Sequence, residues 1–548
     1  MNFIERIFAV LEKQPAKELL LEVHGETSRA TTGKQLVSWV ARIRGCLAEA
    51  GVSTGDRVAL VAPNSSLWCA ADLAALAEGA IVVPMYDRQA PGELAGMLAN
   101  CEPTVLLTSS EELASELRSA WPEHCPIVLL EEAIAHVPSK APLATRRAKD
   151  PVTMIYTSGT SGEPKGVLYS VANVDFMLAR TEQALESMVS LGRRPEQLGQ
   201  DDRVFHYLPF CFAGSRVQLW TQLFRGNPLH MSTDLNNLVQ EMSTAAPNYY
   251  LNVPTVLERV RNGVGAKLAE RGGVIDGLYR AALEAAGKQR EGKANLLDRA
   301  ALLIGQRLVF PAVRKQIGAG LQFLICGSAP LSEETQRWFE AIGIPVYQIY
   351  GLTETTAIVT MDQRERVRPG YVGSVIEGVE LKVSEAGELL CRGPNIFPGY
   401  WRRPEATEKA LQDGWFHTGD LAERTSDGFV RIVGRLKDLL VPESGHNVAP
   451  GPIEEKLVER VPGVEQAMLL GHARPFLSVI LTGQVDDSSV RQALDQINED
   501  LPHYKKVRRY FLAPEPFSVE NGLLTANQKL KRQVVEEHYA SDIEGLYA

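Results

Sequence analysis

A polar loop from Tyr156 to Gly166 is the first segment whose residue types suggest chemistry. It reads YTSGTSGEPKG and holds three glycines, four Ser or Thr hydroxyls and one lysine. Glycines let a backbone approach a phosphate closely, the hydroxyls add hydrogen-bond donors, and Lys165 adds positive charge. The loop is not a Walker A motif, because proline stands at that motif's second glycine and glycine at its Ser or Thr. It is therefore either a phosphate-binding loop of another kind or a solvated turn.

A second candidate site lies at the ends of two expected strands. Leu321–Pro330 reads LQFLICGSAP, a strand that ends in a tight turn, and a helix capped by Ser332 leads to a strand that ends at Tyr350. If the strands are parallel, their carboxyl ends lie side by side, where open α/β sheets bind ligands. The Tyr350 ring can stack on a base, and Glu354 can coordinate Mg²⁺ through oxygen. Taken alone, the tyrosine is equally a core aromatic and the glutamate a surface carboxylate.

Charged residues further along the chain complete the set of candidates. Asp420 follows a glycine in GWFHTGDLAE and is either a hydrogen-bond acceptor for a ribose or a turn residue. Arg435 and Lys437 lie in GRLKDLLV, and Lys529 lies in NGLLTANQKLKR. Each of these cations, considered alone, is typical of a solvated surface.

The elements that must position these residues alternate between strand and helix, which is typical of α/β architecture. A strand and turn are expected at Asp56–Asn64, a helix at Ala70–Gly79 and a strand at Ala80–Tyr86. The polar loop lies between two short apolar runs, VTMIY and GVLY, so it is expected to join two strands, the second of which leads to a helix from Ser170.

The last hundred or so residues follow a different pattern. Short strands are expected at Val464–Gly471 and Phe476–Gly483, and a helix at Ser488–Asp500 with Ser489 as its cap. We place a domain boundary near residues 434–437. A basic run, Lys505–Tyr510, is either a solvated face or a contact for an anionic partner.

Composition excludes several classes of protein. The chain has 548 residues, a formal net charge of -10 and 45% hydrophobic residues, which indicates several globular domains and disfavours nucleic acid as a partner. Seven scattered cysteines without a CxxC pair favour a reducing compartment, and we expect a cytoplasmic location. The N-terminus resembles an amphipathic helix rather than a signal peptide. The most apolar run, Leu67–Tyr86, is interrupted by Asp72 and Glu78, so no membrane span is expected, although peripheral membrane contact stays open.

Taken in order, six segments resemble the adenylate-forming superfamily of acyl-CoA synthetases, peptide-synthetase adenylation domains and luciferases. The segments are YTSGTSGEPKG, GSAPLS, YGLTETT, WFHTGDLAE, GRLKDLLV and NGLLTANQKLKR. The resemblance spans roughly Leu36 to Val535. Within the superfamily, VPTVLERV, GSAPLSEE and NVAPGPIEE look most like the long-chain acyl-CoA synthetase branch, which serves fatty acid metabolism.

The resemblance implies an α/β fold with a large, multi-subdomain N-terminal adenylation domain at residues 1–434. A hinge at 435–437 and a small, mobile α+β C-terminal domain at 438–548 would follow. The implied enzyme is an acid-thiol ligase that uses ATP, Mg²⁺ and coenzyme A. It would activate a long-chain or bulky hydrophobic carboxylic acid to acyl-AMP, release pyrophosphate, and transfer the acyl group to coenzyme A.

The resemblance also assigns roles to matching positions. The loop that grips the β- and γ-phosphates corresponds to Thr157, Ser158, Gly159, Thr160, Ser161, Gly162 and Lys165. The adenine pocket corresponds to Gly327, Ser328, Ala329, Tyr350 and Gly351, and the phosphate and Mg²⁺ contacts to Thr353 and Glu354. Asp420 matches the ribose ligand, Arg435 the ribose-phosphate contact, Lys437 the hinge, and Lys529 the lysine that bridges the carboxylate and the α-phosphate. The catalytic set would be Thr157, Glu354, Lys437 and Lys529.

The acid-binding region departs from the long-chain pattern. The expected acyl pocket corresponds to Phe210, Phe212, Gly214, Gly327 and Gly351. Phe212 replaces the histidine and Ser215 the glutamate of that branch, whereas Arg216 is kept, so an acid other than a plain fatty acid stays open. His446 replaces a lysine that this branch often has, with little expected effect.

Three alternatives to the coenzyme A ligase are considered. A close one is an acyl-AMP ligase that delivers the acyl group to an acyl carrier protein. A P-loop kinase or nucleotide-binding regulator is disfavoured by the missing Walker A spacing. A non-catalytic binding module is disfavoured because Glu354, Asp420, Arg435 and Lys529 are all retained.

Overall fold

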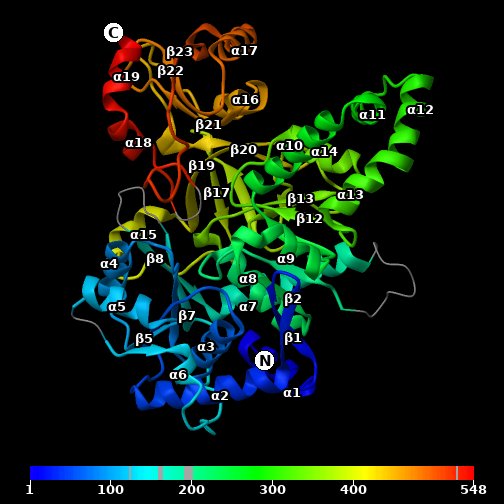
Figure 1. Cartoon of the computed structure of the whole chain (residues 1–548). Helices are drawn as coiled ribbons and strands as arrows, with labels where there is room; N and C mark the ends of the chain where they lie inside the picture. The colour runs from blue at the N-terminus through cyan, green and yellow to red at the C-terminus, as the bar shows by residue number, and fades with distance from the viewer. Residues whose placement is uncertain (123–124, 158–163, 191–200, 526–528) are drawn as a thin grey trace. The chain divides into compact units, whose positions relative to one another are not determined.

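The computed structural model describes residues 1–122, 125–157, 164–190, 201–525 and 529–548 (Figure 1). The chain divides into two compact units, which are described separately. The first comprises residues 1–380, 391–416 and 426–430, and the second comprises residues 381–390, 417–425 and 431–548. Two short segments that precede residue 434 therefore belong to the second unit.

A six-stranded sheet carries the polar loop of the first unit. Its order is β6 (Ile127–Leu129), β5 (Val105–Thr108), β3 (Arg57–Val61), β4 (Ile81–Met85), β7 (Pro151–Thr157) and β8 (Lys165–Ser170). All neighbours are parallel except β7 and β8, which are antiparallel and place Thr157 opposite Lys165. The prediction that this loop joins two strands is confirmed.

Helices cover both faces of this sheet. On one face, buried residues of α4 (Pro91–Cys101) and α5 (Glu111–Ala120) pack against β3, β4 and β5 (Figure 1). On the other face, α3 (Ser66–Ala77) packs against β3 and β4, with α2 (Gly33–Glu49) and the short α6 (Leu130–Ala133) beside it. The predicted strand, helix and strand between residues 56 and 86 are thus confirmed.

A nine-stranded sheet forms the centre of the first unit. Its order is β15 (Ser374–Val375), β14 (Thr360–Met361), β13 (Val346–Tyr350), β12 (Leu324–Cys326), β11 (Tyr249–Asn252), β9 (Val204–His206), β10 (Leu229–Ser232), β1 (Glu18–His24) and β2 (Thr27–Thr32). The strands from β13 to β1 are parallel to their neighbours, whereas β2, β14 and β15 are antiparallel additions at the two edges.

Alternate residues of the central strands face opposite sides of this sheet, because side chains alternate along a strand. Tyr250, Leu324 and Val346 face a core shared with helices of one layer. That layer comprises α9 (Leu238–Ala245), α10 (Pro254–Arg271), α11 (Gly273–Arg290), α12 (Leu296–Ile304), η3 (Gly305–Val309), α13 (Phe310–Gly318) and α14 (Glu333–Ala341).

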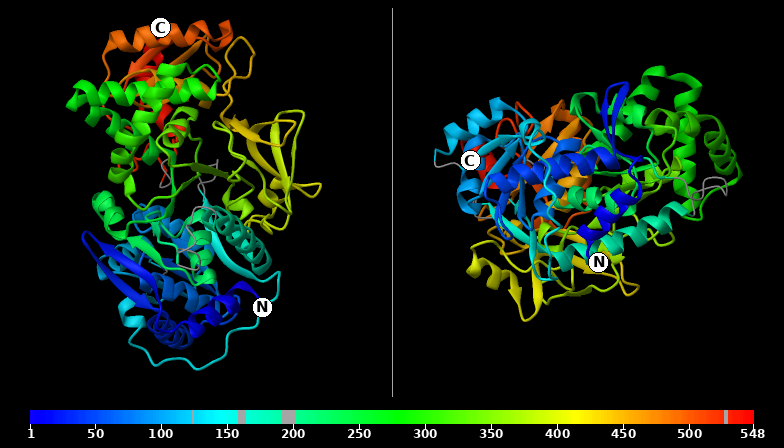
Figure 2. Two further views of the ribbon diagram at one scale, coloured as in Figure 1. Left: turned by 90° about the vertical axis from the view of Figure 1, so that its right-hand side faces the viewer. Right: turned by 90° about the horizontal axis from the view of Figure 1, so that it is seen from below.

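The opposite side of the sheet is covered by α7 (Val171–Ser190) and α8 (Ala213–Arg225), and α1 (Phe3–Lys13) packs on both of them (Figure 2). The N-terminal segment is an amphipathic helix as expected, and it begins with a capping box between Asn2 and Glu5.

A five-stranded sheet has the order β16 (Glu380–Val383), β17 (Glu388–Arg392), β19 (Trp415–Arg424) and β18 (Leu411–Gln412), with β20 (Val430–Arg435) beside β19. The helix α15 (Pro404–Ala410) precedes β18.

The second unit is built around a three-stranded sheet in the order β21 (Val464–Leu470), β22 (Leu477–Gly483) and β23 (Val507–Leu512). One face packs against α16 (Gly451–Arg460) and α17 (Asp487–Glu499). The other face packs against α18 (Arg532–His538) and α19 (Ala540–Tyr547). The basic run forms the end of a short 3₁₀ turn and the start of β23, where Val507 is buried and Arg508 and Arg509 are exposed.

Three expected boundaries differ from the structure. The cap of α17 is Asp486, whose carboxylate accepts backbone N–H groups of Ser488 and Ser489, so the expectation of a serine cap was wrong. Helix α7 begins one residue later than predicted because Ser170 still belongs to β8. Strand β12 is shorter than the apolar run around it. Among the described helices, none combines the length and hydropathy needed to cross a membrane.

Candidate active site

Two neighbouring strand ends in the first unit form one wall of the candidate site. Strands β12 and β13 are parallel, with Cys326 opposite Gln348, and their carboxyl ends carry Gly327 and Gly351. Tyr350 and Gly351 are both half-buried, whereas Ser328 and Ala329 are exposed. The expected juxtaposition of the two segments is therefore present.

Both glycines are required by close packing of the backbone. A Cβ atom at Gly351 would lie 2.0 Å from the carbonyl oxygen of Ala357, and one at Gly327 would lie 2.7 Å from Cγ1 of Ile349. The neighbouring residues Ser328, Thr356 and Ala357 have positive φ angles of 74°, 50° and 81°. Such left-handed conformations are rare outside glycine and often mark functional turns.

A cation, an aromatic ring and a carboxylate lie in one row beside these turns. The Lys165 ammonium lies 5.3 Å from the centroid of the Tyr400 ring. The Tyr400 hydroxyl donates a hydrogen bond of 2.8 Å to Oε1 of Glu354, which lies in the 3₁₀ turn η4 (Thr353–Thr355). The half-buried Glu354 is therefore held by a specific partner, which the interpretation as an ordinary surface carboxylate did not anticipate.

Backbone contacts tie this row to the strand that carries the lysine. The residue Trp401 donates its N–H to the carbonyl of Gly166 in β8 at 2.7 Å, and Tyr400 forms a bridge with Val167. The buried Tyr169 hydroxyl donates to the carbonyl of Thr353 at 2.7 Å. Burial raises the pKa of this tyrosine well above its usual value, so its hydroxyl is a proton donor at neutral pH.

The first half of the polar loop ends within the described residues. Thr157 is half-buried at the end of β7. The predicted phosphate contacts at residues 158–162, namely Ser158, Gly159, Thr160, Ser161 and Gly162, lie outside the described residues.

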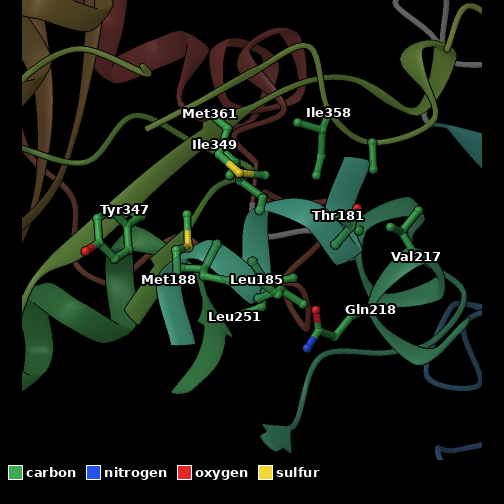
Figure 3. Close-up of a pocket in the computed structure, with 14 residues that line it drawn as sticks. Thr181, Leu185, Met188, Val217, Gln218, Leu251, Tyr347, Ile349, Ile358 and Met361 are labelled. Atoms are coloured by element: carbon green, nitrogen blue, oxygen red, sulfur yellow. The ribbon is translucent and has the colours of Figure 1, made fainter. Parts of the chain in front are cut away.

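An apolar pocket lies between the nine-stranded sheet and helices α7 and α8 (Figure 3). The space between these elements that is not filled by atoms is about 490 Å³, and part of it is open to solvent. Its walls are formed by Thr181, Ala184, Leu185, Met188, Gly214, Val217, Gln218, Leu251, Ile325, Tyr347, Ile349, Ala357, Ile358 and Met361.

The expected acyl-pocket residues have different positions relative to this pocket. Gly214 lines it, and Gly327 and Gly351 each lie against a lining residue. Phe210 is buried below the surface, where its ring stacks on His206 at 5.1 Å. Phe212 lies at the start of α8, 6.0 Å from the Tyr86 ring, and neither phenylalanine is among the lining residues.

A buried ion pair fixes the far side of α8. Arg216 donates to Asp72 Oδ1 at 2.6 Å, and the indole N–H of Trp220 donates to Oδ2 at 2.8 Å. The side chains of the pair are 0% and 1% exposed. Burial raises the pKa of the Asp72 carboxyl, and the arginine and the indole oppose that shift. The pair anchors the helix whose other face lines the pocket.

The remaining candidates belong to the second unit. Arg435 Nε donates to Asp420 Oδ1 at 2.7 Å, and Asp420 is buried in β19. Lys437 lies in the 3₁₀ turn η5 (Leu436–Asp438) that follows β20. Lys529 is exposed, and its backbone pairs with that of Thr525. The structure thus brings together Asp420 and Arg435 in one unit, and Lys165, Glu354 and the glycine turns in the other.

Glu354 and its surroundings fit a magnesium ion that substrate phosphates would also bind. Mg²⁺ prefers oxygen ligands and is usually held by one or two carboxylates plus phosphates. The hydrogen bond from Tyr400 orients the Glu354 carboxylate, which provides such an oxygen. Across the described residues, no cluster of three or more His, Cys, Asp or Glu offers a metal site of protein ligands alone.

Sequence reasoning missed Tyr400, Tyr169 and the pair Asp72–Arg216. One signal was available for the ion pair. Asp72 lies inside the most apolar run of the chain, and a buried charge requires a partner. Tyr400 lies 46 residues from Glu354, and no local spacing relates the two.

Comparison with known proteins covers nearly the whole chain. A family model described as AMP-binding enzyme matches residues 7–401, and one described as AMP-binding enzyme C-terminal domain matches residues 437–548. The chain is 30% identical over 542 residues to the long-chain-fatty-acid–CoA ligase FadD15 of Mycobacterium bovis, covering 91% of this chain and 89% of that protein. It is 24% identical over 577 residues to a long-chain-fatty-acid–CoA ligase of Xenopus laevis, covering 91% and 77%.

Solved structures share the fold. The anthranilate CoA ligase AuaEII in complex with anthranoyl-AMP matches with a TM-score of 0.77 at 20% identity, covering 99% of this chain and 98% of that one. A fatty acyl CoA synthetase of Mycobacterium tuberculosis matches with a TM-score of 0.68 at 21% identity over 99% of both chains. The predicted α/β fold with a large N-terminal part and a small C-terminal part is confirmed.

Proposed function

Because the chain belongs to the AMP-binding enzyme family, we propose that it is an AMP-forming acid:CoA ligase. In the first half-reaction a carboxylate oxygen attacks the α-phosphorus of ATP, the bond to the bridging oxygen breaks, and pyrophosphate leaves. In the second, a thiolate attacks the acyl carbonyl of the acyl-AMP and AMP leaves. The observation that carries the proposal is an apolar pocket beside two glycine turns, within the unit that also holds Lys165 and Glu354.

The proposed roles follow from charge. A carboxylate that approaches a phosphate brings two anions together, and in a water-poor site this repulsion must be offset by cations and N–H donors. Lys529 would bridge the two reacting groups, while Thr157 and Lys165 would hold the outer phosphates. When bound at Glu354, Mg²⁺ would neutralise part of the phosphate charge.

The proposed nucleoside contacts are an aromatic residue and a buried carboxylate. Tyr350 would stack on the adenine, and Asp420 would accept hydrogen bonds from the ribose, with Arg435 holding the carboxylate in place. We further propose residues 1–434 as the adenylation domain, 435–437 around Lys437 as a hinge, and 438–548 as a mobile domain.

We propose a long-chain or other bulky hydrophobic acid as the substrate. The pocket is lined almost wholly by apolar side chains, and the relatives above are named long-chain-fatty-acid–CoA ligases. An acyl carrier protein is the alternative acceptor. Offering the purified protein free coenzyme A and a holo-carrier protein in separate reactions, with the acyl product followed, distinguishes the two.

Carboxylate-dependent exchange of labelled pyrophosphate into ATP tests the first half-reaction. We expect Lys529→Ala to lose roughly two to three decades of exchange rate, as for a lost transition-state donor. Thiolation of a supplied acyl-adenylate should stay largely intact, and the neighbouring Lys531→Ala should retain both activities. Equal loss of both half-reactions in Lys529→Ala would contradict the assigned role, and exchange that needs no acid would contradict the proposed function.

We also propose peripheral contact with an anionic membrane through α12 and η3. Leu296, Leu297 and Leu308 are 81%, 80% and 69% exposed there, and Arg299 and Arg307 are exposed among them. Exposed leucines with arginines are typical of helices that lie on lipid surfaces. Leu297→Glu should reduce co-sedimentation with anionic vesicles, whereas self-association without vesicles would contradict the proposal.

The seven cysteines form no disulfide, which supports a cytoplasmic location.

A further inference from the structure

One polar side chain stands out on the apolar wall of the pocket. Gly214, Val217 and Gln218 line the pocket from α8, and their spacing of three and four residues places them on one face of the helix. Figure 3 shows the Gln218 amide between α8 and Leu251. The residue is only 5% exposed, so its amide lies in a largely dry environment.

The Gln218 amide has no protein partner for its nitrogen. Among the described residues, Nε2 is buried and makes no hydrogen bond, and no other lining residue has such an atom. Thr181, also in the wall, donates its hydroxyl to the carbonyl of Met177 at 2.8 Å and is thereby satisfied. An unsatisfied buried amide carries a desolvation penalty, so it is rarely retained without a partner.

The polar character continues along the same helix. Thr221 follows Gln218 by three residues, is fully buried, and its hydroxyl also lacks a hydrogen-bond partner among the described residues. Gln218 lines the pocket and Thr221 lies one turn further along α8, outside the lining; apart from Thr181 and Gly214, the other walls are aliphatic, methionine and tyrosine side chains. A plain hydrocarbon chain in the pocket would leave the Gln218 amide nitrogen unpaired.

We propose that the preferred acid carries an oxygen function, a hydroxyl or carbonyl, remote from its carboxylate, and that this oxygen accepts a hydrogen bond from Gln218. The inference rests on the proposed function and refines its substrate class. Sites built to hydrogen-bond a substrate group discriminate strongly against analogues that lack it, because the protein group is then left unpaired.

Matched acids test this inference. Pyrophosphate exchange is measured with hexadecanoic acid and with a series of hydroxy- and oxo-hexadecanoic acids whose oxygen moves along the chain. We expect the wild-type enzyme to favour at least one oxygenated acid about tenfold or more in kcat/KM. Gln218→Met, which keeps the length of the side chain, should abolish that preference, so that the ratio of kcat/KM for the oxygenated acid to that for hexadecanoic acid falls to about one. Val217→Ala, on the same face, should retain the preference.

A binding measurement separates this inference from the proposed function. The shift in thermal midpoint caused by each acid, without nucleotide, reports occupation of the pocket in the absence of turnover. A larger shift for the oxygenated acid, lost in Gln218→Met, supports the inference whether or not any acid supports exchange. Absence of exchange with every acid would refute the proposed ligase function and leave the binding result standing. Equal shifts and equal kcat/KM for each matched pair, or a preference unchanged in Gln218→Met, would overturn the inference.

Discussion

The hydrogen bond from Tyr400 to Glu354 offers the sharpest test of the site. Tyr400→Phe removes one hydroxyl that donates to a carboxylate at 2.8 Å and keeps the ring beside Lys165. A hydrogen bond to a charged group contributes about 1.5 to 3 kcal/mol. If the bond orients Glu354 for the metal and the phosphates, its loss lowers adenylation by about one to two decades.

The assay is the initial rate of acid-dependent pyrophosphate exchange at several Mg²⁺ concentrations. We expect Tyr400→Phe to need more Mg²⁺ for its half-maximal rate, because the carboxylate proposed as the Mg²⁺ ligand is less well oriented. Tyr400→Leu, which also removes the ring beside Lys165, should lose a few-fold more, in line with about 0.5 to 1 kcal/mol for an exposed cation–π contact.

Two results would refute this reasoning. Exchange by Tyr400→Phe at the wild-type rate and Mg²⁺ dependence would show that the hydroxyl does not prepare Glu354. A loss of thiolation from supplied acyl-adenylate equal to the loss of exchange would indicate a general structural defect. A thermal midpoint measured alongside identifies such a defect directly.

Three further predictions concern the framework. Gly351→Ala should abolish most adenylation, since its methyl group would lie 2.0 Å from a carbonyl oxygen, whereas Gly263→Ala, in an open stretch of helix, should leave exchange unchanged. Burial raises the pKa of Asp362 to about 7, above the value of about 4 in the unfolded chain. The folded state therefore holds this proton more tightly than the unfolded chain does. The stabilisation is fully present below about pH 4 and is lost as the pH rises through 7. Asp362→Asn should therefore raise the thermal midpoint over wild type more at pH 8 than at pH 5. Asp72→Asn leaves the buried Arg216 charge unpaired and should cost about 3 to 5 kcal/mol in urea unfolding, whereas replacing both residues by apolar ones should cost much less.

Local patterns predicted the parts of the fold that depend on neighbours in the chain. The apolar runs on either side of the polar loop became β7 and β8, and Ser332 caps α14 as expected. The cap of α17 was assigned to Ser489 because a serine preceded the apolar pattern, but Asp486 lies three residues earlier and its carboxylate accepts two N–H groups. Competing cap residues within one turn are not distinguished by spacing alone.

The spacing of residues in the sequence could not predict contacts between distant segments. Asp72 and Arg216 are 144 residues apart, and the packing of α3 against α8 alone makes them partners. Gln218 is one of many glutamines in the sequence, and its significance depends on which face of α8 the sheet covers. The motif residues could be named from the sequence, whereas the side chains that orient them could not.

Adjacent residues of β12 and β13 face opposite sides of the sheet and have different surroundings. Leu324 and Val346 belong to the core shared with one helix layer, whereas the next residue of each strand, Ile325 and Tyr347, lines the apolar pocket. Ile325 and Tyr347 are themselves buried, at 8% and 4% exposed, so a smaller residue at either position enlarges the pocket and also loses packing. Substitutions at Ile325 or Tyr347 therefore act on the pocket directly, whereas substitutions at Leu324 or Val346 act on the core.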